Sequence, residues 1–153
     1  MKIIVDAMGG DNAPLEIVKG ALQGRARWGV DIVLTGDAAQ ILRALEECGE
    51  KTVPQGVEIA NATQTVEMCD DPATVFRRKK DTSMGVGLTM LREGKADALA
   101  SAGSTGALLT GATLITKRIH GIRRAAMAPV IPTTTGQAVL IDCGANAECT
   151  PEY

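Results

Sequence analysis

Short apolar runs of about five residues alternate along this chain with segments whose apolar residues recur at helical spacing. This alternation is typical of βαβ units, in which parallel strands are joined by helices that cover the sheet. We therefore predict an α/β fold: a three-layer α/β/α sandwich with a mostly parallel, doubly wound sheet. The predicted strands are residues 2–6, 31–35, 57–60, 96–100, 128–131 and 138–142, and the strand over 96–100 is expected to be buried on both faces.

The predicted helices lie between these strands. The first carries Pro14 in its first turn, is capped by Asp11 or Asn12, and runs to about Trp28. The second ends near Gly49, where a glycine favours helix termination. After a polar loop over 61–71, the remaining helices are a short one through residue 76, one over 83–93 and one that runs to about 119.

The chain has the length of one domain. Its 153 residues are enough to bury a core without disulfides or metals, and it contains no repeat, low-complexity segment or interdomain linker. We therefore expect a single α/β domain over residues 1–153. Its core must be aliphatic, because Trp28, Phe76 and Tyr153 are the only aromatic residues.

Composition argues against several classes of function. The net charge of −2 gives no field that attracts nucleic acid, and the scarcity of aromatic residues disfavours stacking on bases. The four cysteines form no C-x-x-C motif and the only histidine is His120, so no zinc cluster and no other metal site is expected. Neither a signal peptide nor a membrane span is recognisable. We expect a soluble cytoplasmic protein with free thiols and no nucleic-acid partner.

Three loops at predicted strand ends are unusually rich in small residues. They read AMGGDN at 7–12, SAGSTG at 101–106 and DCGAN at 142–146. Glycine lets the backbone approach a ligand, and successive N–H groups at the start of a helix bind anions. Any one such loop is more often a simple turn, but three on one sheet edge favour an anion site. The residues that we expect to bind phosphate are Gly9, Gly10, Ser101, Gly103, Ser104, Thr105, Gly106, Asp142 and Gly144.

The chain matches neither of the stricter nucleotide motifs. It lacks G-x-x-x-x-G-K-[ST], and Gly85-Val86-Gly87 is not followed by the third glycine of a dinucleotide site. Asp6, Asp11 and Asp142 could ligate Mg²⁺ or orient the glycine loops, and a capping role suits Asp11 equally well. The basic run over 77–80 either complements a helix C-terminus or holds an acidic partner or a phosphate. The candidate catalytic residues are Asp6, Asp11, Asn12, Lys79, Lys80 and Asn146.

Four blocks of the chain together resemble one known family. The blocks are DAMGGDNAP at 6–14, FRRKKDTSM at 76–84, SAGSTGALL at 101–109 and DCGANAECTPEY at 142–153. In order and spacing they are similar to the bacterial phosphate acyltransferases of phospholipid synthesis, the PlsX family. The resemblance extends from Lys2 to Tyr153.

The resemblance implies a reaction and a set of partners. Such enzymes transfer a fatty acyl group from acyl carrier protein to inorganic phosphate, and the acyl phosphate passes to a glycerol-3-phosphate acyltransferase. The implied fold is similar to phosphotransacetylases and to isocitrate and isopropylmalate dehydrogenases. The implied assembly is a homodimer, peripheral at the inner face of the cell membrane, with no cofactor. Because carrier protein is acidic, Arg77 and Arg78 become candidates for docking it, beside Lys79 and Lys80.

The sequence also departs from the family pattern. Ser104 stands where members usually carry Asn, and Arg124-Ala125 where they often have Arg-Pro. Family chains continue well beyond the block that ends at Tyr153, so we expect this chain to correspond to an N-terminal portion. Two alternatives stay open: a phosphotransacetylase-like enzyme that uses acyl-CoA, and a non-catalytic α/β fragment that binds phosphate or carrier protein.

Overall fold

The computed structural model describes residues 1–122, 125–141 and 143. The chain divides into two compact units, Met1–Thr116 and Lys117–Tyr153. A single domain over residues 1–153 stays a prediction.

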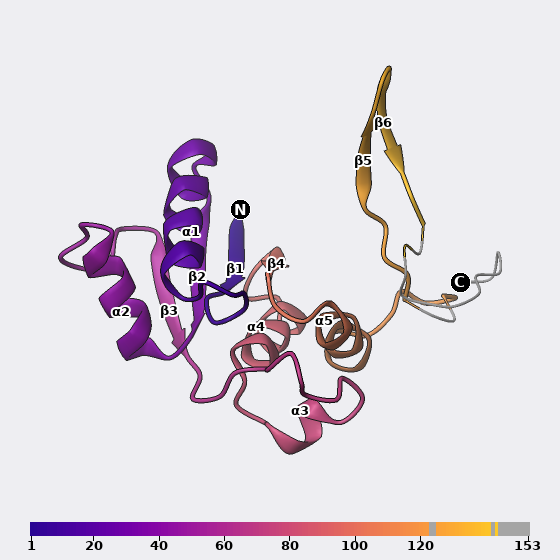
Figure 1. Cartoon of the computed structure of the whole chain (residues 1–153), viewed down its shortest axis with the longest axis horizontal. Coiled ribbons are helices and arrows are strands. Elements are labelled where there is room, and N and C mark those ends of the chain that lie inside the picture. Colours follow the sequence, from indigo (N-terminus) through magenta and orange to yellow (C-terminus); the bar gives the residue numbers. More distant parts are fainter. Residues whose placement is uncertain (123–124, 142, 144–153) are drawn as a thin grey trace. The chain divides into compact units, whose positions relative to one another are not determined.

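The first unit is built on a four-stranded parallel sheet (Figure 1). The strand order is β3-β2-β1-β4, and Ile4 in β1 pairs with Val33 in β2 and with Leu99 in β4. The chain thus builds the sheet outward from β1 and then returns to add β4 on the other side of β1. The strands are β1 (Lys2–Asp6), β2 (Asp31–Gly36), β3 (Val57–Asn61) and β4 (Ala98–Ala100).

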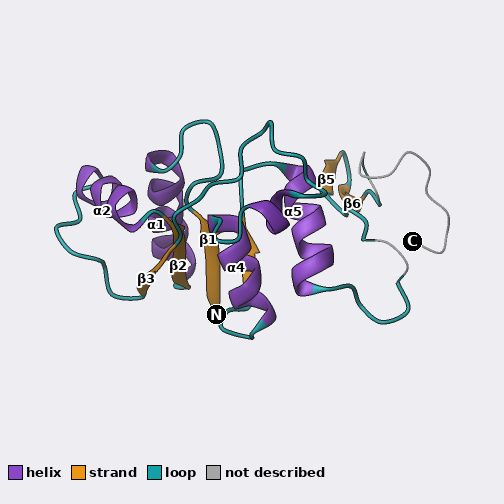
Figure 2. Ribbon diagram, turned by 90° about the horizontal axis from the view of Figure 1, so that it is seen from below, coloured by secondary structure: helices purple, strands orange, loops and turns teal. Residues whose placement is uncertain are grey.

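Helices cover both faces of this sheet, as Figure 2 shows. One face carries α1 (Leu15–Trp28) and α2 (Ala38–Glu47), and the other carries α4 (Ser83–Arg92). Around α4 pack the short helix α3 (Val75–Arg78) and α5 (Thr105–Gly111), which continues as a π-helical turn over Ala112–Thr116. These layers confirm the predicted α/β class with a parallel sheet.

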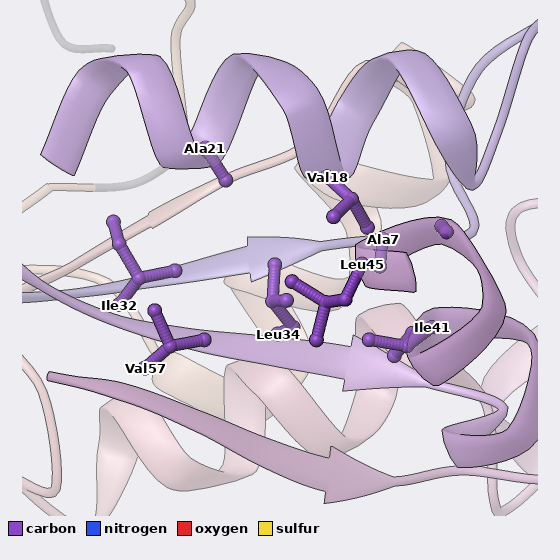
Figure 3. Packing of buried hydrophobic residues seen from close by; sticks show 9 residues of the cluster. Ala7, Val18, Ala21, Ile32, Leu34, Ile41, Leu45 and Val57 are labelled. Carbon is purple, nitrogen blue, oxygen red and sulfur yellow. The ribbon is translucent and has the colours of Figure 1, made fainter. Parts of the chain in front are cut away.

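Each helical layer forms its own aliphatic core. On the first face, α1 and α2 pack against β2 and β3 through Val18, Ala21, Ile41, Leu45, Ile32, Leu34 and Val57 (Figure 3). On the second face the buried cluster consists of Val75, Met84, Leu88 and Ala107. Because the sheet is apolar on both faces, burial of these side chains stabilises all three layers together.

The start of α1 differs from the prediction. The helix begins at Leu15, Pro14 occupies the N-cap position, and no side chain caps the helix. Asp11 and Asn12 lie in the preceding turn, where the carbonyl of Asn12 accepts the N–H of Glu16 at 3.2 Å. The expectation of an Asp11 or Asn12 side-chain cap was wrong because backbone carbonyls of the turn accept the first N–H groups instead.

Strand β4 is also more exposed than predicted. It covers only residues 98–100, and in the described part of the chain it pairs with β1 alone. Ala98 and Ala100 are exposed. Burial on both faces would need a further strand or helix beyond β4, so the expectation for 96–100 was wrong. The helical segment after β4 ends at Thr116 and not near residue 119. The next residue, Lys117, has a φ of 74°.

The second unit contains an antiparallel hairpin. Strand β5 (Val130–Thr133) pairs with β6 (Gly136–Val139), and both strands are exposed throughout. We had expected 128–131 and 138–142 to join the parallel sheet. That expectation was wrong, because parallel neighbours need a crossover of a dozen or more residues and only six separate these two runs.

Within residues 1–122, 125–141 and 143, no helix combines the length and the hydrophobicity that a membrane span requires.

The two cores lead to a prediction about leucines of different burial. Leu34 of β2 is fully buried, whereas Leu42 of α2 is 48% exposed. Leu34→Ala should lower the free energy of unfolding by about 2–5 kcal/mol, because it leaves a cavity in the first core. Leu42→Ala should change it by no more than about 0.5 kcal/mol. Urea unfolding measures both, and equal losses in the two variants would contradict the assigned core.

Candidate functional site

The carboxyl ends of β1 and β4 lie side by side where the winding of the sheet changes direction. The loop after β1 leads to α1 on one face, and the loop after β4 leads to α5, which packs with α4 on the other face. In parallel α/β sheets, loops that diverge in this way open a crevice that binds ligands. We call the residues that meet here the switch-point site: Asp6, Gly9, Gly10, Ser101 and Gly103.

A hydrogen-bonded pair joins the two loops. The Ser101 hydroxyl donates to Asp6 Oδ2 at 2.8 Å, although the two residues are 95 positions apart. The N–H of Met8 donates to Asp6 Oδ1 at 3.3 Å, and the N–H of Gly103 donates to Ser101 Oγ at 3.1 Å. Asp6 is only 2% exposed. The Ser101 hydroxyl and the Met8 N–H satisfy the buried carboxylate, and the three hydrogen bonds together fix the positions of both loops.

The two glycines after β1 serve different purposes. A Cβ on Gly9 would lie 2.7 Å from Asp6 Oδ2, 2.9 Å from Ser101 Oγ and 2.9 Å from the Gly103 nitrogen. Gly9 is therefore required by the close approach of the two loops. Gly10 has a φ of +125°, a conformation that favours glycine, and it lies against Ala102. Contacts between the two loops therefore account for both Gly9 and Gly10 without any ligand.

Three further predicted residues lie beside the site. Ser104 is buried and its hydroxyl accepts the N–H of Ala107 at 3.4 Å, which caps α5. Thr105 and Gly106 follow at the exposed start of α5, and Gly106 faces Pro72. Asp11 and Asn12 are exposed in the turn before α1 and are not drawn into the Asp6–Ser101 network. The predicted Asp142, Gly144 and Asn146 lie outside the described residues.

In the basic run over 77–80, one residue makes an ion pair and the other three are exposed. Lys79 Nζ pairs with Asp70 Oδ2 at 2.5 Å and donates to the carbonyl of Thr65 at 3.0 Å. The Lys79 ammonium is therefore used to hold the 65–70 loop against the end of α3. The side chains of Arg77, Arg78 and Lys80 are exposed.

A second loop contact, which the sequence reasoning missed, positions α4. Asp81 Oδ2 accepts both the N–H and the hydroxyl of Thr63, at 2.9 and 2.7 Å. The buried Thr82 hydroxyl caps α4 by accepting the N–H of Gly85 at 3.0 Å. A Thr or Ser before an apolar helical run is a recognised N-cap pattern, so Asp81-Thr82-Ser83 carried a usable signal. The helix so placed puts Met84 beneath Gly103.

The other candidate chemistries find little support in the described ranges. Among these residues no three His, Cys, Asp or Glu side chains gather as a metal site would require. His120 is exposed, and Cys48, Cys69 and Cys143 are free thiols.

The Asp70–Lys79 pair predicts a local dependence on pH. The hydrogen bond from Lys79, followed by that from the N–H of Glu67, lowers the pKa of Asp70 below its ordinary value of 3.8. A carboxyl with a lowered pKa in the folded state stabilises that state above its unfolded pKa, and the contribution is lost as pH falls through the folded pKa. Lys79→Met should raise the pKa of Asp70 toward 3.8 and weaken this acid dependence. NMR titration of the Asp70 carboxyl measures it.

The control for this titration is Lys80→Met, which removes an exposed cation next in the chain. It should leave the pKa of Asp70 where it is in the parent chain. Equal shifts in the two variants would mean that net charge, and not the Lys79 contact, sets the pKa of Asp70.

The close approach of the loops predicts opposite effects for two glycine substitutions. Gly9→Ala places a methyl group against backbone and buried polar atoms, and it should cost about 1–3 kcal/mol of stability. Gly20→Ala, in the middle of α1, meets nothing within 4 Å and should add about 1 kcal/mol through helix propensity. Urea unfolding compares the two, and a neutral Gly9→Ala would show that the loops are farther apart.

Comparison with known proteins places this chain among proteins of lipid synthesis. A family model described as "Fatty acid synthesis protein" matches residues 1–153. The chain is 48% identical over 153 residues to a phosphate acyltransferase of Desulfitobacterium hafniense, covering 100% of this chain and 45% of the relative. It is 43% identical over 151 residues to a phosphate acyltransferase of Thermoanaerobacterium thermosaccharolyticum, covering 99% of this chain and 44% of the relative.

The chain therefore spans somewhat less than half the length of these curated relatives. The match over every described element and the identity above 40% establish the relationship. This chain belongs to the fatty acid synthesis protein family, that of the phosphate acyltransferases which its four sequence blocks resemble.

Proposed function

We propose that this chain carries part of the active site of an enzyme that transfers a fatty acyl group from acyl carrier protein to inorganic phosphate. The observation that carries the proposal is the junction of the β1 and β4 loops at the switch-point site, in a chain related to phosphate acyltransferases. Glycines at that junction leave the loop backbone without side chains, which close approach of an anion to the backbone requires.

The reaction requires no covalent intermediate with the protein. A phosphate oxygen attacks the thioester carbonyl, a tetrahedral intermediate forms, and the carbon–sulfur bond breaks to release the carrier thiol and acyl phosphate. Phosphate is itself the nucleophile, so no catalytic serine or cysteine is required. The protein must hold the phosphate near the carbonyl and stabilise the oxyanion with N–H groups or cations.

The geometry supports different roles for the two side chains of the pair. Because the Ser101 hydroxyl donates to Asp6, it is not free to donate to phosphate at the same time. By the same criterion the N–H groups of Gly103 and Gly9 are engaged, with Ser101 Oγ and with the carbonyl of Asp6. We assign the phosphate contacts to the backbone N–H of Gly10 and to the exposed hydroxyl of Thr105. Asp6 is assigned as a positioning residue, because its carboxylate holds both loops in place.

The other candidate residues have more peripheral roles in the proposal. Ser104 and Gly106 shape the start of α5, and Asp11 and Asn12 are exposed in the turn that follows Gly10. Lys79 acts through the 65–70 loop, whereas Lys80 stays available to an anion. Asp142, Gly144 and Asn146 lie outside the described residues and stay candidates from the sequence alone.

The proposal includes a carrier-protein surface at the basic run. Arg77 and Arg78 are exposed at the end of α3, and exposed arginines suit an acidic partner. Family membership further supports a homodimer in the cytoplasm, peripheral at the inner face of the membrane. There it would deliver acyl phosphate to a glycerol-3-phosphate acyltransferase.

An assay of thioester cleavage tests the reaction. The chain is incubated with palmitoyl-carrier protein, with and without inorganic phosphate, and release of the free carrier thiol is followed. Phosphate-dependent release supports the proposal. Turnover only with palmitoyl-CoA would assign a phosphotransacetylase-like activity instead. Saturable binding of phosphate or carrier protein without turnover would identify a binding fragment.

Two charge-matched double variants test the docking surface. In the same assay, binding of the carrier is measured as the concentration of palmitoyl-carrier protein that gives half-maximal release of the thiol. Arg77→Ala with Arg78→Ala should weaken binding of the carrier at low salt by about tenfold, because two exposed cations are lost. Arg92→Ala with Lys95→Ala removes the same charge at the end of α4 and should leave binding unchanged. Equal effects would show that only net charge matters.

A further inference from the structure

Part of the long connection between β3 and α4 packs against the start of α5. We call residues 65–74 the strap. Its Pro72 ring lies so close to α5 that a Cβ on Gly106 would be 3.2 Å from Pro72 Cγ. The turn around this proline is held by Asp71 Oδ1, which accepts the N–H of Ala73 at 3.0 Å. The strap and α5 belong to the same compact unit of the chain.

Two glycines of α5 leave room for the strap and for the helix that follows it. Gly106 faces Pro72, and a Cβ on Gly111 would lie 2.8 Å from the ring of Phe76 and 2.5 Å from Leu88. Glycine disfavours helices, and neither position has a positive φ that would call for it. Close packing therefore accounts for both glycines, and the contact with Pro72 fixes where α5 begins.

One cation holds the strap in this position. Lys79 Nζ pairs with Asp70 Oδ2 at 2.5 Å and donates to the carbonyl of Thr65 at 3.0 Å, so a single ammonium joins both ends of the turn between them. Asp70 Oδ2 also accepts the N–H of Glu67 at 2.8 Å. The side chains of Lys79 and Asp70 are only 28% and 22% exposed, so water screens the ion pair less than it would on an open surface.

We propose that Lys79 is a positioning residue: it latches the strap, and the strap holds the start of α5, where Thr105 precedes Gly106. The inference rests on the proposed function, which assigns a phosphate contact to the Thr105 hydroxyl. Because two acceptors already engage the ammonium, Lys79 acts on phosphate through the placement of α5 and not by touching it.

Hydrogen exchange tests the latch without any substrate. The N–H of Leu108 donates to the carbonyl of Ser104 at 2.9 Å and reports on the first turn of α5. Lys79→Met should speed its exchange about tenfold, because a charge-assisted hydrogen bond that holds the strap is lost. Lys79→Arg keeps a cation for Asp70 and should restore most of the protection.

Two controls accompany this measurement. Lys95→Met removes the same charge from an exposed position after α4 and should leave the exchange of Leu108 unchanged. The N–H of Val18, which donates to the carbonyl of Pro14 at 2.9 Å, lies in the helical layer on the other face of the sheet. It should exchange equally in every variant, which verifies that each is folded.

A double variant tests the connection between the latch and α5. Gly106→Ala should speed the exchange of Leu108, because its methyl group meets Pro72 while the strap is held. In the Lys79→Met background the same substitution should have little further effect, since the strap can then move away. Additive effects would show that Lys79 and Gly106 act independently.

Phosphate affinity separates positioning from direct contact. Inorganic phosphate is titrated into the chain while the amide signals of Gly10 and Thr105 are followed by NMR. Lys79→Met and Asp70→Asn should both weaken binding, each by about fivefold, because both release the strap. A lysine that bound phosphate directly would give the opposite result in Asp70→Asn, which frees the ammonium and removes a negative charge.

Unchanged exchange of Leu108 in Lys79→Met, or stronger phosphate binding in Asp70→Asn, would overturn the inference. The two readouts also separate it from the proposed function. If phosphate binds the parent chain and both latch variants equally well, the phosphate assignment stands and the positioning role of Lys79 fails. If the exchange of Leu108 responds as expected but the parent chain binds no phosphate, the latch stands and the phosphate assignment of the proposed function fails.

Discussion

The hydrogen bond between Ser101 and the buried carboxylate of Asp6 is the contact on which the rest of the site depends. It joins the ends of β1 and β4, and it can form only because Gly9 and Gly103 bring the two loops together without side chains between them. A buried carboxylate is costly unless it is satisfied, so the donors around Asp6 fix the geometry of both loops. The positions of the β1 and β4 loops at the switch point follow from this junction.

The layers on either side hold the junction in place. The core under α1 and α2 fixes β1 and β2, and the core under α4 and α5 supports the β4 loop through Met84. The polar contacts of Asp81 and Lys79 tie the long 61–72 connection to the start of α4 and the end of α3. Both layers therefore support the β1 and β4 loops, and Arg77, Arg78 and Lys80 are exposed at the end of α3.

Much of the first unit could be predicted from the sequence, because hydrophobic periodicity and glycine breaks reflect local physics. Strands over 2–6, 31–35 and 57–60 and the helix over 83–93 agree with the structure to within a residue or so. The exposure of β4 could not be predicted, because the alanines of this strand fit a covered and an uncovered position equally well. The cap of α1 depended on the turn geometry around Pro14, and the β5–β6 hairpin on a connection too short for a parallel crossover.

The sequence by itself determined the α/β class and the family, because both are carried by local patterns and by linked motifs. It marked Asp6, Gly9, Ser101 and Gly103 as candidates without stating which of them touch. Only the tertiary structure decided that Asp6 binds Ser101 across 95 positions, that Gly9 is required by backbone contact, and that Lys79 is engaged by Asp70. The physical reason is that these contacts follow from strand order, and β4 reaches β1 only after the chain has crossed the sheet.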